Sequence, residues 1–319
     1  MTPPLVTIGI CCYNASETIS RAINSALNQD WLNLEIIIAD DLSADDSREV
    51  VLEAIAGKTN AKLITHDNNQ GPAGTRNSII KEAAGEFIAF FDDDDESFSN
   101  RVSCQIQYLQ NFEERLKTKQ IACYASGVRH YENGYKKNLA AIGSKGDEIP
   151  NGNKLANYLL LHQKENNWFY GTGTPTCSLM ARTETIKNNG SFDPGLRRVE
   201  DVDFAIRLAM NGGYFIGTRE TLFNQYATEA SDKSAEKNLE AEQTLVRKHK
   251  QYLTSIGKYY YALHWPKLRY WHFKKNYFKF IIEFLGLFCR HPFSVLPHIL
   301  ATGPRRLIHE RKMKKAIFK

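Results

Sequence analysis

Short apolar runs alternate with helical patterns over the first hundred residues. Apolar side chains dominate four runs, which we predict to be buried β-strands: 6–12, 34–39, 61–65 and 87–91. Between them, apolar residues recur at helical spacing over 19–27, 46–56 and 73–84. Strands and helices that alternate in this way indicate a parallel sheet flanked by helices, which is an α/β fold.

The pattern becomes looser after residue 100. It predicts helices at 99–117, 201–212 and 231–256, strands at 121–126 and 176–181, and a polar, glycine-rich stretch at 129–152. The last part of the chain is basic and aromatic and lacks the strand–helix alternation. We therefore predict two domains, an α/β domain at 1–230 and a helical C-terminal extension at 231–319.

Polar side chains follow three of the four predicted strands of the first hundred residues. They are Tyr13-Asn14, Asp40-Asp41 and the acidic run that begins at Asp92. In open parallel sheets, ligands bind beyond the carboxyl ends of the strands. These positions therefore predict a binding site at one edge of the sheet.

The acidic run Asp92-Asp93-Asp94-Asp95-Glu96 comes directly after a strand that is apolar at every position. Crowded carboxylates repel one another unless a cation neutralises them. In an extended segment, Asp92 and Asp94 would point to the same side. Oxygen ligands of this kind suit Mg²⁺ or Mn²⁺ bridging a diphosphate. The alternative is a solvated acidic loop.

Three further positions have a functional and a structural interpretation. Glu200-Asp201 begins a predicted helix, where a carboxylate either caps the helix or serves as a general base. The Tyr13 ring either stacks on a nucleobase or packs under the first helix. Asp40 and Asp41 either accept hydrogen bonds from a base or ribose or form a turn. A Gly-x-Gly-x-x-Gly motif after a strand and a phosphate-binding lysine loop are both absent, which disfavours dinucleotide-cofactor and P-loop enzymes.

Charge and cysteine content add two expectations. Residues 259–319 hold 13 Lys and Arg against 2 acids, whereas residues 1–258 hold 28 basic and 34 acidic residues. The acidic first part disfavours a nucleic-acid partner, and the tail is suited to an anionic one. The six cysteines show no Cys-x-x-Cys pair, so we expect reduced thiols in a cytoplasmic protein.

The sequence resembles glycosyltransferase family 2. The resemblance rests on Val6 to Asn14, Ile38 to Asp45, Phe90 to Asp95 and Glu200-Asp201, together with the linking loop from Asn68 to Asn77, and covers about residues 5–225. It implies a GT-A fold, a nucleotide-diphosphosugar donor (UDP-linked by our expectation), Mn²⁺ or Mg²⁺, and inversion at the anomeric carbon. Where members of the family often carry Arg and His after the last strand, this chain reads Tyr226-Ala227-Thr228-Glu229.

By this resemblance each motif residue has an expected role. Asp201 would be the general base and Glu200 would contact the acceptor. Asp92 and Asp94 would bind the metal. The donor would be bound by the following residues: Tyr13, Asp40, Asp41, Arg76, Asp92 and Asp93. The acceptor would be a surface glycan or a lipid-linked glycan. Two other functions stay open, a nucleotidyltransferase and a non-catalytic protein that binds nucleotide-sugars.

The tail is the second informative region. Aromatic residues alternate with Lys and Arg from Tyr259 to Lys279. Such a composition is typical of the interface between water and lipid, so we expect peripheral contact with the inner face of the cell membrane. Packing of the aromatic residues in the core or in an oligomer is the main alternative, and a nucleic-acid surface is the other. The apolar run from Phe280 to Cys289 is interrupted by Glu283 and is too short to cross a bilayer.

Overall fold

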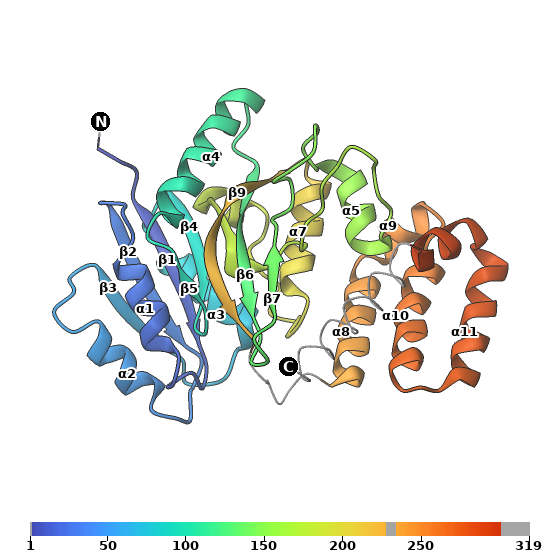
Figure 1. The fold of residues 1–319 in the computed structure, drawn as a ribbon, viewed down its shortest axis with the longest axis horizontal. Coiled ribbons are helices and arrows are strands. Elements are labelled where there is room, and N and C mark those ends of the chain that lie inside the picture. The colour runs from blue at the N-terminus through green and yellow to red at the C-terminus, as the bar shows by residue number, and fades with distance from the viewer. Residues whose placement is uncertain (1, 228–233, 301–319) are drawn as a thin grey trace. The chain divides into compact units, whose positions relative to one another are not determined.

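A computed structural model describes residues 2–227 and 234–300, which form two compact units (Figure 1). The larger unit is an α/β unit made of residues 2–131, 136–156 and 165–227. The smaller unit is helical and is made of residues 132–135, 157–164 and 234–300. The predicted domain boundary between residues 230 and 231 lies outside the described residues.

The α/β unit is built on a mixed nine-stranded sheet. Its strands are β1 Val6–Cys12, β2 Leu34–Asp40, β3 Ala61–Thr65, β4 Phe87–Asp92, β5 Glu96–Ser97, β6 Ile121–His130, β7 Lys136–Leu139, β8 Leu179–Arg182 and β9 Tyr214–Tyr226. The strand order is β3-β2-β1-β4-β8-β6-β9-β5, with β7 paired to β6. Strands β1 to β4 run parallel to one another, whereas β8 is antiparallel to β4 and β6. The predicted α/β fold is confirmed.

The first seven α-helices are α1 Ile19–Leu27, α2 Ser47–Ala54, α3 Gly71–Glu82, α4 Arg101–Leu116, α5 Gly152–Leu161, α6 Thr183–Asn188 and α7 Glu200–Met210. Six of them belong to the α/β unit, and α5 is divided between the two units. Alternate residues of β1, such as Ile8 and Ile10, pack with α1, α2 and α4 in one core. On the opposite face of β1, a Cβ at Gly9 would lie 2.7 Å from the Ile79 side chain, so glycine permits the close approach of α3.

Two predicted elements are confirmed only in part. The strand predicted at 176–181 is a 3-10 turn, η1 Thr176–Ser178, followed by β8. Here Ser178 donates both its amide and its hydroxyl hydrogen to the carbonyl of Pro175, and such local bonds compete with strand pairing. The helix predicted at 231–256 is two helices, α8 Ala235–Lys248 and α9 Lys250–Ser255. The break at His249 is marked by neither Gly nor Pro, which is why the pattern missed it.

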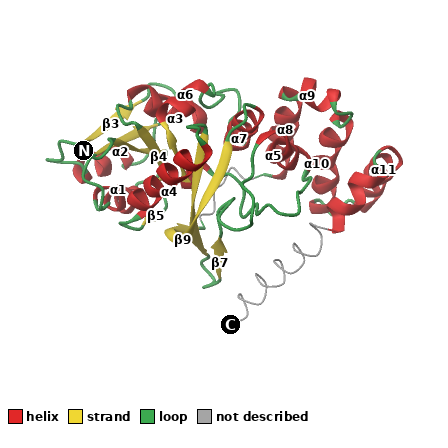
Figure 2. Cartoon of the chain, turned by 90° about the horizontal axis from the view of Figure 1, so that it is seen from above, coloured by secondary structure: helices red, strands yellow, loops and turns green. Residues whose placement is uncertain are grey.

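The helical unit has a core of its own. Helix α10, Tyr259–Phe273, packs against both α8 and α11, Tyr277–Arg290, so the three lie side by side with α10 in the middle (Figures 1 and 2). Buried residues of this core include Leu253, Tyr261, Leu268 and Leu287. Tyr259, Tyr260 and Trp265 pack against it.

A fully buried arginine joins the carboxyl end of β4 to its neighbours. Arg101, at the start of α4, donates from one terminal nitrogen to the carbonyl oxygens of Phe90 and Cys177, both at 2.8 Å. It also donates to the Ser97 hydroxyl at 2.9 Å, and its guanidinium lies 4.2 Å from the centre of the Phe91 ring. Burial lowers the pKa of Arg101 to about 10, which leaves it charged at neutral pH.

We predict that Arg101→Met lowers the free energy of unfolding by about 3 kcal/mol, because it removes the cation from carbonyl groups and acids that stay buried. Denaturant unfolding of the purified protein measures this change. Arg115→Met is the matched control, since Arg115 is exposed at the other end of the same helix. Equal unfolding free energies for the two variants would show that Arg101 does not hold this edge together.

Candidate active site

The chain turns sharply at the carboxyl end of β4. Asp92 is the last residue of the strand, Asp93 and Asp94 lie in a turn, and the amide of Asp95 donates to the carbonyl of Asp92 at 3.4 Å. The extended geometry from which we predicted that Asp92 and Asp94 share one side is therefore wrong. The acids are nevertheless gathered in one place, because the charge of Asp94 acts on both Asp92 and Asp95.

This turn is electrostatically strained. Burial, followed by the charges of neighbouring acids, raises the pKa of Asp93 and of Asp95 to about 8. Burial also raises the pKa of Asp92, where the charge of Arg76 works in the opposite direction. A nearby cation stabilises the ionised form of carboxyl groups whose pKa is raised in this way. A divalent ion bound here would displace the protons that Asp93 and Asp95 hold at neutral pH and would stabilise their ionised form.

The carboxylate oxygens near the acidic turn are suitable ligands for a hard cation. Asp92, Asp95 and Cys177 bring ligand atoms within 4.8 Å of one another. Burial raises the pKa of the Cys177 thiol well above its usual value, so at neutral pH it is not the thiolate that binds metals. Oxygen ligands are those that Mg²⁺ and Mn²⁺ prefer. Metal binding by Asp92 and Asp94 remains a prediction.

Asp95 has a structural function that the sequence did not reveal. Its carboxylate accepts the backbone amide of Tyr226 and the side-chain amide of Gln225, both at 3.3 Å. It therefore connects the acidic turn to the end of β9.

The first strand ends beside the acidic turn. The amide of Tyr13 donates to the Asp93 carboxylate at 3.1 Å, and the Tyr13 ring is 52% exposed. The predicted alternative, a ring packed under the first helix, does not fit this exposure. Asn14, in left-handed geometry with φ of 49°, accepts the amide of Ala44 at 2.8 Å. The loops after β1 and β2 are thus joined.

Asp40 and Asp41 are both buried and both engaged with the protein. Asp40 forms an ion pair with Arg48 at 2.5 Å and accepts the amide of Ser43 at 3.2 Å. Asp41 accepts the backbone amides of Gln70 at 2.7 Å and Gly71 at 2.8 Å, so it holds the loop before α3. Little of the Asp41 carboxylate is left for a ligand, and the predicted donor contacts of both residues stay untested.

Arg76 joins the acidic turn to the start of α7. It projects from α3, is buried, and forms an ion pair with Glu200 at 2.5 Å. Its charge also acts on Asp92 and on Asp201. Two motifs more than a hundred residues apart in the sequence therefore meet around one guanidinium. Glu200 is buried in this pair, so the acceptor contact predicted for it remains a prediction.

Asp201 has the environment of a general base. Burial, and then the charge of Glu200, raises the pKa of Asp201 to about 6. One carboxylate oxygen accepts the amide of the next residue, Val202, at 2.7 Å. A base with a pKa near the working pH is ionised yet still takes up a proton readily. Helix capping alone would not require this shift.

Sequence reasoning missed two side chains near these groups. Arg21 of α1 donates to the carbonyl of Asp94 at 2.5 Å and lies 4.2 Å from the centre of the Tyr226 ring. Tyr124 of β6 is 1% exposed, and within the described residues its hydroxyl has no hydrogen-bond partner. Burial and then the charge of Asp201 raise the pKa of Tyr124 well above its usual value. Neither residue belongs to a sequence motif.

The sequence profile of Glycosyl transferase family 2 matches residues 7–183, which is more than half of the chain. The chain therefore belongs to this family, and its sheet with flanking helices is the expected GT-A fold.

Relatives match over a smaller region. The glucosyltransferase WfgD of Escherichia coli, named for UDP-Glc and α-D-GlcNAc-diphosphoundecaprenol, is 42% identical over 105 residues, which are 33% of this chain and 41% of that protein. A Campylobacter jejuni β-1,3-glucosyltransferase, named for GalNAc(5)-diNAcBac-PP-undecaprenol, is 37% identical over 105 residues, 33% of this chain and 34% of that protein. The chain thus covers well under half the length of either relative.

Solved structures show the same fold. TarS residues 1–349 of S. aureus superpose with a TM-score of 0.57 at 19% identity, covering 85% of this chain and 73% of that one. The same fragment in complex with UDP-GlcNAc also gives a TM-score of 0.57, covering 84% of this chain and 73% of that one.

We predict that Mn²⁺ raises the melting temperature of the protein, because it relieves repulsion among the carboxylates after β4. Differential scanning fluorimetry with and without the ion measures the increment. Asp94→Asn should abolish most of it and should weaken Mn²⁺-dependent donor binding. Asp147→Asn, which removes an exposed acid, is the control. An increment in Asp94→Asn equal to that of the parent would contradict the metal assignment.

Proposed function

We propose that this protein transfers a sugar, with inversion, from a UDP-linked sugar to a hydroxyl of a lipid-linked glycan. The observation that carries the proposal is the meeting of the acidic turn after β4 with Glu200-Asp201 around Arg76. Membership of the family supports sugar transfer as the reaction. The names of the relatives favour lipid-diphosphate acceptors.

The donor end of the site is the edge formed by β1, β2 and β4. The exposed Tyr13 ring offers a face to a nucleobase, and stacking of this kind contributes about 1–3 kcal/mol. Asp40 and Asp41 fix the loops around that position, which is how we propose they support donor binding. Asp93 fixes the backbone of Tyr13 and sets where the ring lies.

Asp92 and Asp94 would hold a divalent cation, Mn²⁺ or Mg²⁺, beside the diphosphate. A bound cation would neutralise the charge that develops on the departing diphosphate. Arg76 adds a fixed positive charge in the same region, because it is buried and acts electrostatically on Asp92. Arg21, which touches the carbonyl of Asp94, places a second cation beside the turn.

Asp201 would remove the proton from the acceptor hydroxyl. The acceptor oxygen then forms a bond to the anomeric carbon while the bond from that carbon to the diphosphate oxygen breaks. The proton goes to the Asp201 carboxylate, and the electron pair of the broken bond leaves with the UDP. A single displacement of this kind inverts the anomeric centre without a covalent enzyme intermediate. Glu200 pairs with Arg76 and orients the start of α7.

The acceptor class sets where the reaction takes place. A glycan on a lipid diphosphate is confined to a membrane surface, so the protein would act as a peripheral protein at the cytoplasmic face of the cell membrane. No helix in the described ranges, 2–227 and 234–300, is long and apolar enough to cross a bilayer.

A panel of nucleotide-sugars tests the proposed reaction. We expect Mn²⁺-dependent release of UDP from one UDP-sugar, faster when a lipid-diphosphate acceptor is present. Release of pyrophosphate would indicate a nucleotidyltransferase, and binding without any release would indicate a non-catalytic protein. Either result would overturn the proposal.

We predict that Asp201→Asn lowers the turnover rate by about 10²–10⁴-fold and leaves donor affinity close to that of the parent. Isothermal calorimetry with UDP measures the affinity, and UDP release measures turnover. Glu184→Gln is the matched control, because Glu184 is an exposed acid in the first turn of α6. If the two variants keep similar activity, Asp201 is only a capping residue.

The pH profile gives an independent readout of the same residue. The raised pKa of about 6 means that the ionised, active form of Asp201 is lost as the pH falls through that value. In the parent, kcat/KM should therefore fall about tenfold per pH unit below about 6. The residual activity of Asp201→Asn should lack this decline. An unchanged profile in the variant would assign the titration to another group.

A further inference from the structure

Large apolar side chains are exposed along one side of α11. Phe278 is 76% exposed, and Ile281, Ile282 and Leu285 are each more than half exposed. These positions are spaced i, i+3, i+4 and i+7, which places them in one narrow row along the helix. The exposed Cys289, eleven residues after Phe278, continues this row. We call these five residues the α11 stripe.

The opposite side of α11 faces the core of the helical unit. Leu287 is fully buried, and Phe284 and Phe288 pack against the same core. Glu283, the only acid of α11, contacts His264 of α10 at 2.9 Å and so lies on this inner side. Helix α11 borders α10 at the edge of the three-helix group (Figures 1 and 2). The α11 stripe thus carries apolar side chains and no carboxylate.

Basic residues flank the stripe. Lys275, Lys279 and Arg290 are exposed, and none of them forms an ion pair with any residue at 2–227 or 234–300. Aromatic rings support two of these cations: Lys279 lies 4.3 Å from the Trp271 ring centre, and Arg290 lies 4.1 Å from that of Tyr260. In the sequence, residues 301–319 add seven more Lys and Arg and a single acid.

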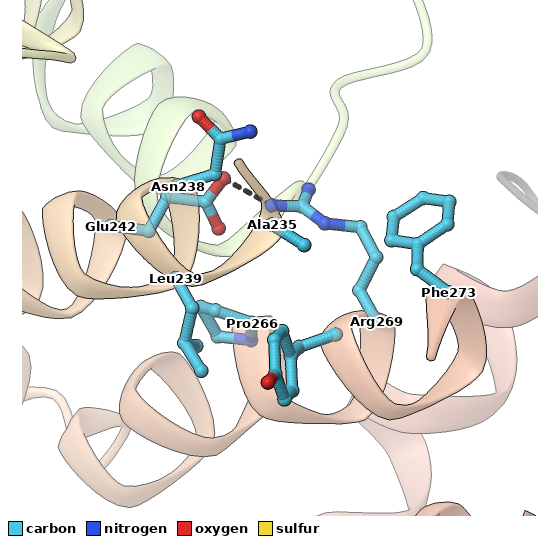
Figure 3. A pocket seen from close by; sticks show the side chains of 8 residues that line it. Ala235, Asn238, Leu239, Glu242, Pro266, Arg269 and Phe273 are labelled. Atoms are coloured by element: carbon cyan, nitrogen blue, oxygen red, sulfur yellow. Dashed lines mark hydrogen bonds and ion pairs between the residues drawn. The ribbon is translucent and has the colours of Figure 1, made fainter. Parts of the chain in front are cut away.

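The cations in and beside the groove between α8 and α10 are paired with acids, unlike those beside the α11 stripe. The groove is about 490 Å³ in volume, and Figure 3 shows the Arg269 guanidinium pointing at the Glu242 carboxylate across it. Beside it, Lys274 pairs with Glu236 at 2.5 Å. Cations already paired with acids attract an anionic surface less than unpaired ones do. Lys275, Lys279 and Arg290 differ in this respect, because no acid within the described residues forms an ion pair with them.

The structure also separates the aromatic residues of the tail into two groups. Tyr261 is buried in the core of the helical unit, and Tyr259, Tyr260 and Trp265 pack against it, as the packing alternative expects. Tyr277 and Phe278 are exposed on α11. The packing alternative thus holds for these four residues of α10 and not for the exposed Phe273 of α10 or the exposed residues of α11.

We propose that the α11 stripe inserts into the surface of a bilayer that contains anionic lipids, with α11 lying along the membrane plane. An exposed apolar row bordered by Lys and Arg is the composition of helices that bind at such interfaces. Basic residues near an anionic leaflet contribute about 1 kcal/mol each, and apolar side chains enter the acyl boundary. The inference concerns lipid binding alone and does not depend on which sugar or acceptor the enzyme uses.

Vesicle co-sedimentation of the full chain tests the proposal. The vesicles contain phosphatidylcholine with 30% phosphatidylglycerol (about the anionic content of a bacterial membrane), or phosphatidylcholine alone. We expect binding to the anionic vesicles that weakens about tenfold or more in the variant Phe278→Gln/Ile281→Gln/Leu285→Gln, because each removed side chain loses apolar burial. Leu32→Gln/Leu52→Gln is the matched control, since both residues are exposed in the α/β unit and lie outside the stripe.

A second readout reports the position of the helix. Cys289 is the one exposed cysteine of the six, all of which lie within the described residues, so a polarity-sensitive fluorophore labels it selectively. Its emission should shift to the blue with anionic vesicles and should return in 1 M salt, where the Debye length is about 3 Å. Donor binding and UDP release in solution should be equal in the stripe variant and the parent, which separates failure of this proposal from failure of the proposed function.

Three outcomes would overturn the proposal. Equal vesicle binding by parent and stripe variant would place lipid contact elsewhere. Concentration-dependent self-association of the parent that the stripe variant lacks, without vesicle binding, would identify a second copy of the chain as the occupant. A blue-shifted label without lipid, abolished by deletion of residues 301–319, would show that the end of the chain covers the stripe.

Discussion

Repulsion among the carboxylates that follow β4 is the constraint on which the rest of the site depends. Four aspartates in succession would separate if the chain were free to move. They are held together because Arg101 secures the end of β4 through the carbonyls of Phe90 and Cys177, and because Arg76 acts on Asp92 from the other side. The raised pKa values of Asp93 and Asp95 show that these two arginines do not fully offset the burial and repulsion of the acids. A divalent cation would supply the missing positive charge and favour the ionised carboxylates.

Several carboxylates at this edge of the sheet accept hydrogen bonds from backbone amides. Asp41 accepts the amides of Gln70 and Gly71, Asp93 accepts the amide of Tyr13, and Asp95 accepts the amide of Tyr226. Each connects loops or strand ends that are distant in the sequence. A substitution at one of them would therefore disturb loop geometry as well as any ligand contact. Asp201, whose carboxylate accepts a hydrogen bond from the neighbouring amide of Val202 and forms no ion pair within residues 2–227 and 234–300, is better suited to exchange protons with a substrate.

The parallel strands and the family could be predicted from the sequence, because both depend on local patterns of residues. The apolar run before Asp92 and the turn residues after each strand are signals of that kind. Arg101, Arg21 and Tyr124 were missed because their importance comes from partners across the fold, such as the carbonyl of Cys177 and the charge of Asp201. The break at His249 was missed because neither Gly nor Pro marks it. The composition of the tail likewise suggested a lipid interface but did not show which aromatic residues are exposed. The structure shows that Tyr261 is buried and Phe278 is exposed.

The anomeric configuration of the product distinguishes sugar transfer by single displacement from a retaining reaction. The purified protein would be incubated with Mn²⁺, its UDP-α-sugar donor and a short-chain lipid-diphosphate glycan acceptor, and the product would be examined by proton NMR. We predict a β-linked sugar in the first product formed, with one UDP released per linkage. An α-linked product would contradict this prediction, because retention of configuration requires either a covalent intermediate or attack from the face that the diphosphate occupies.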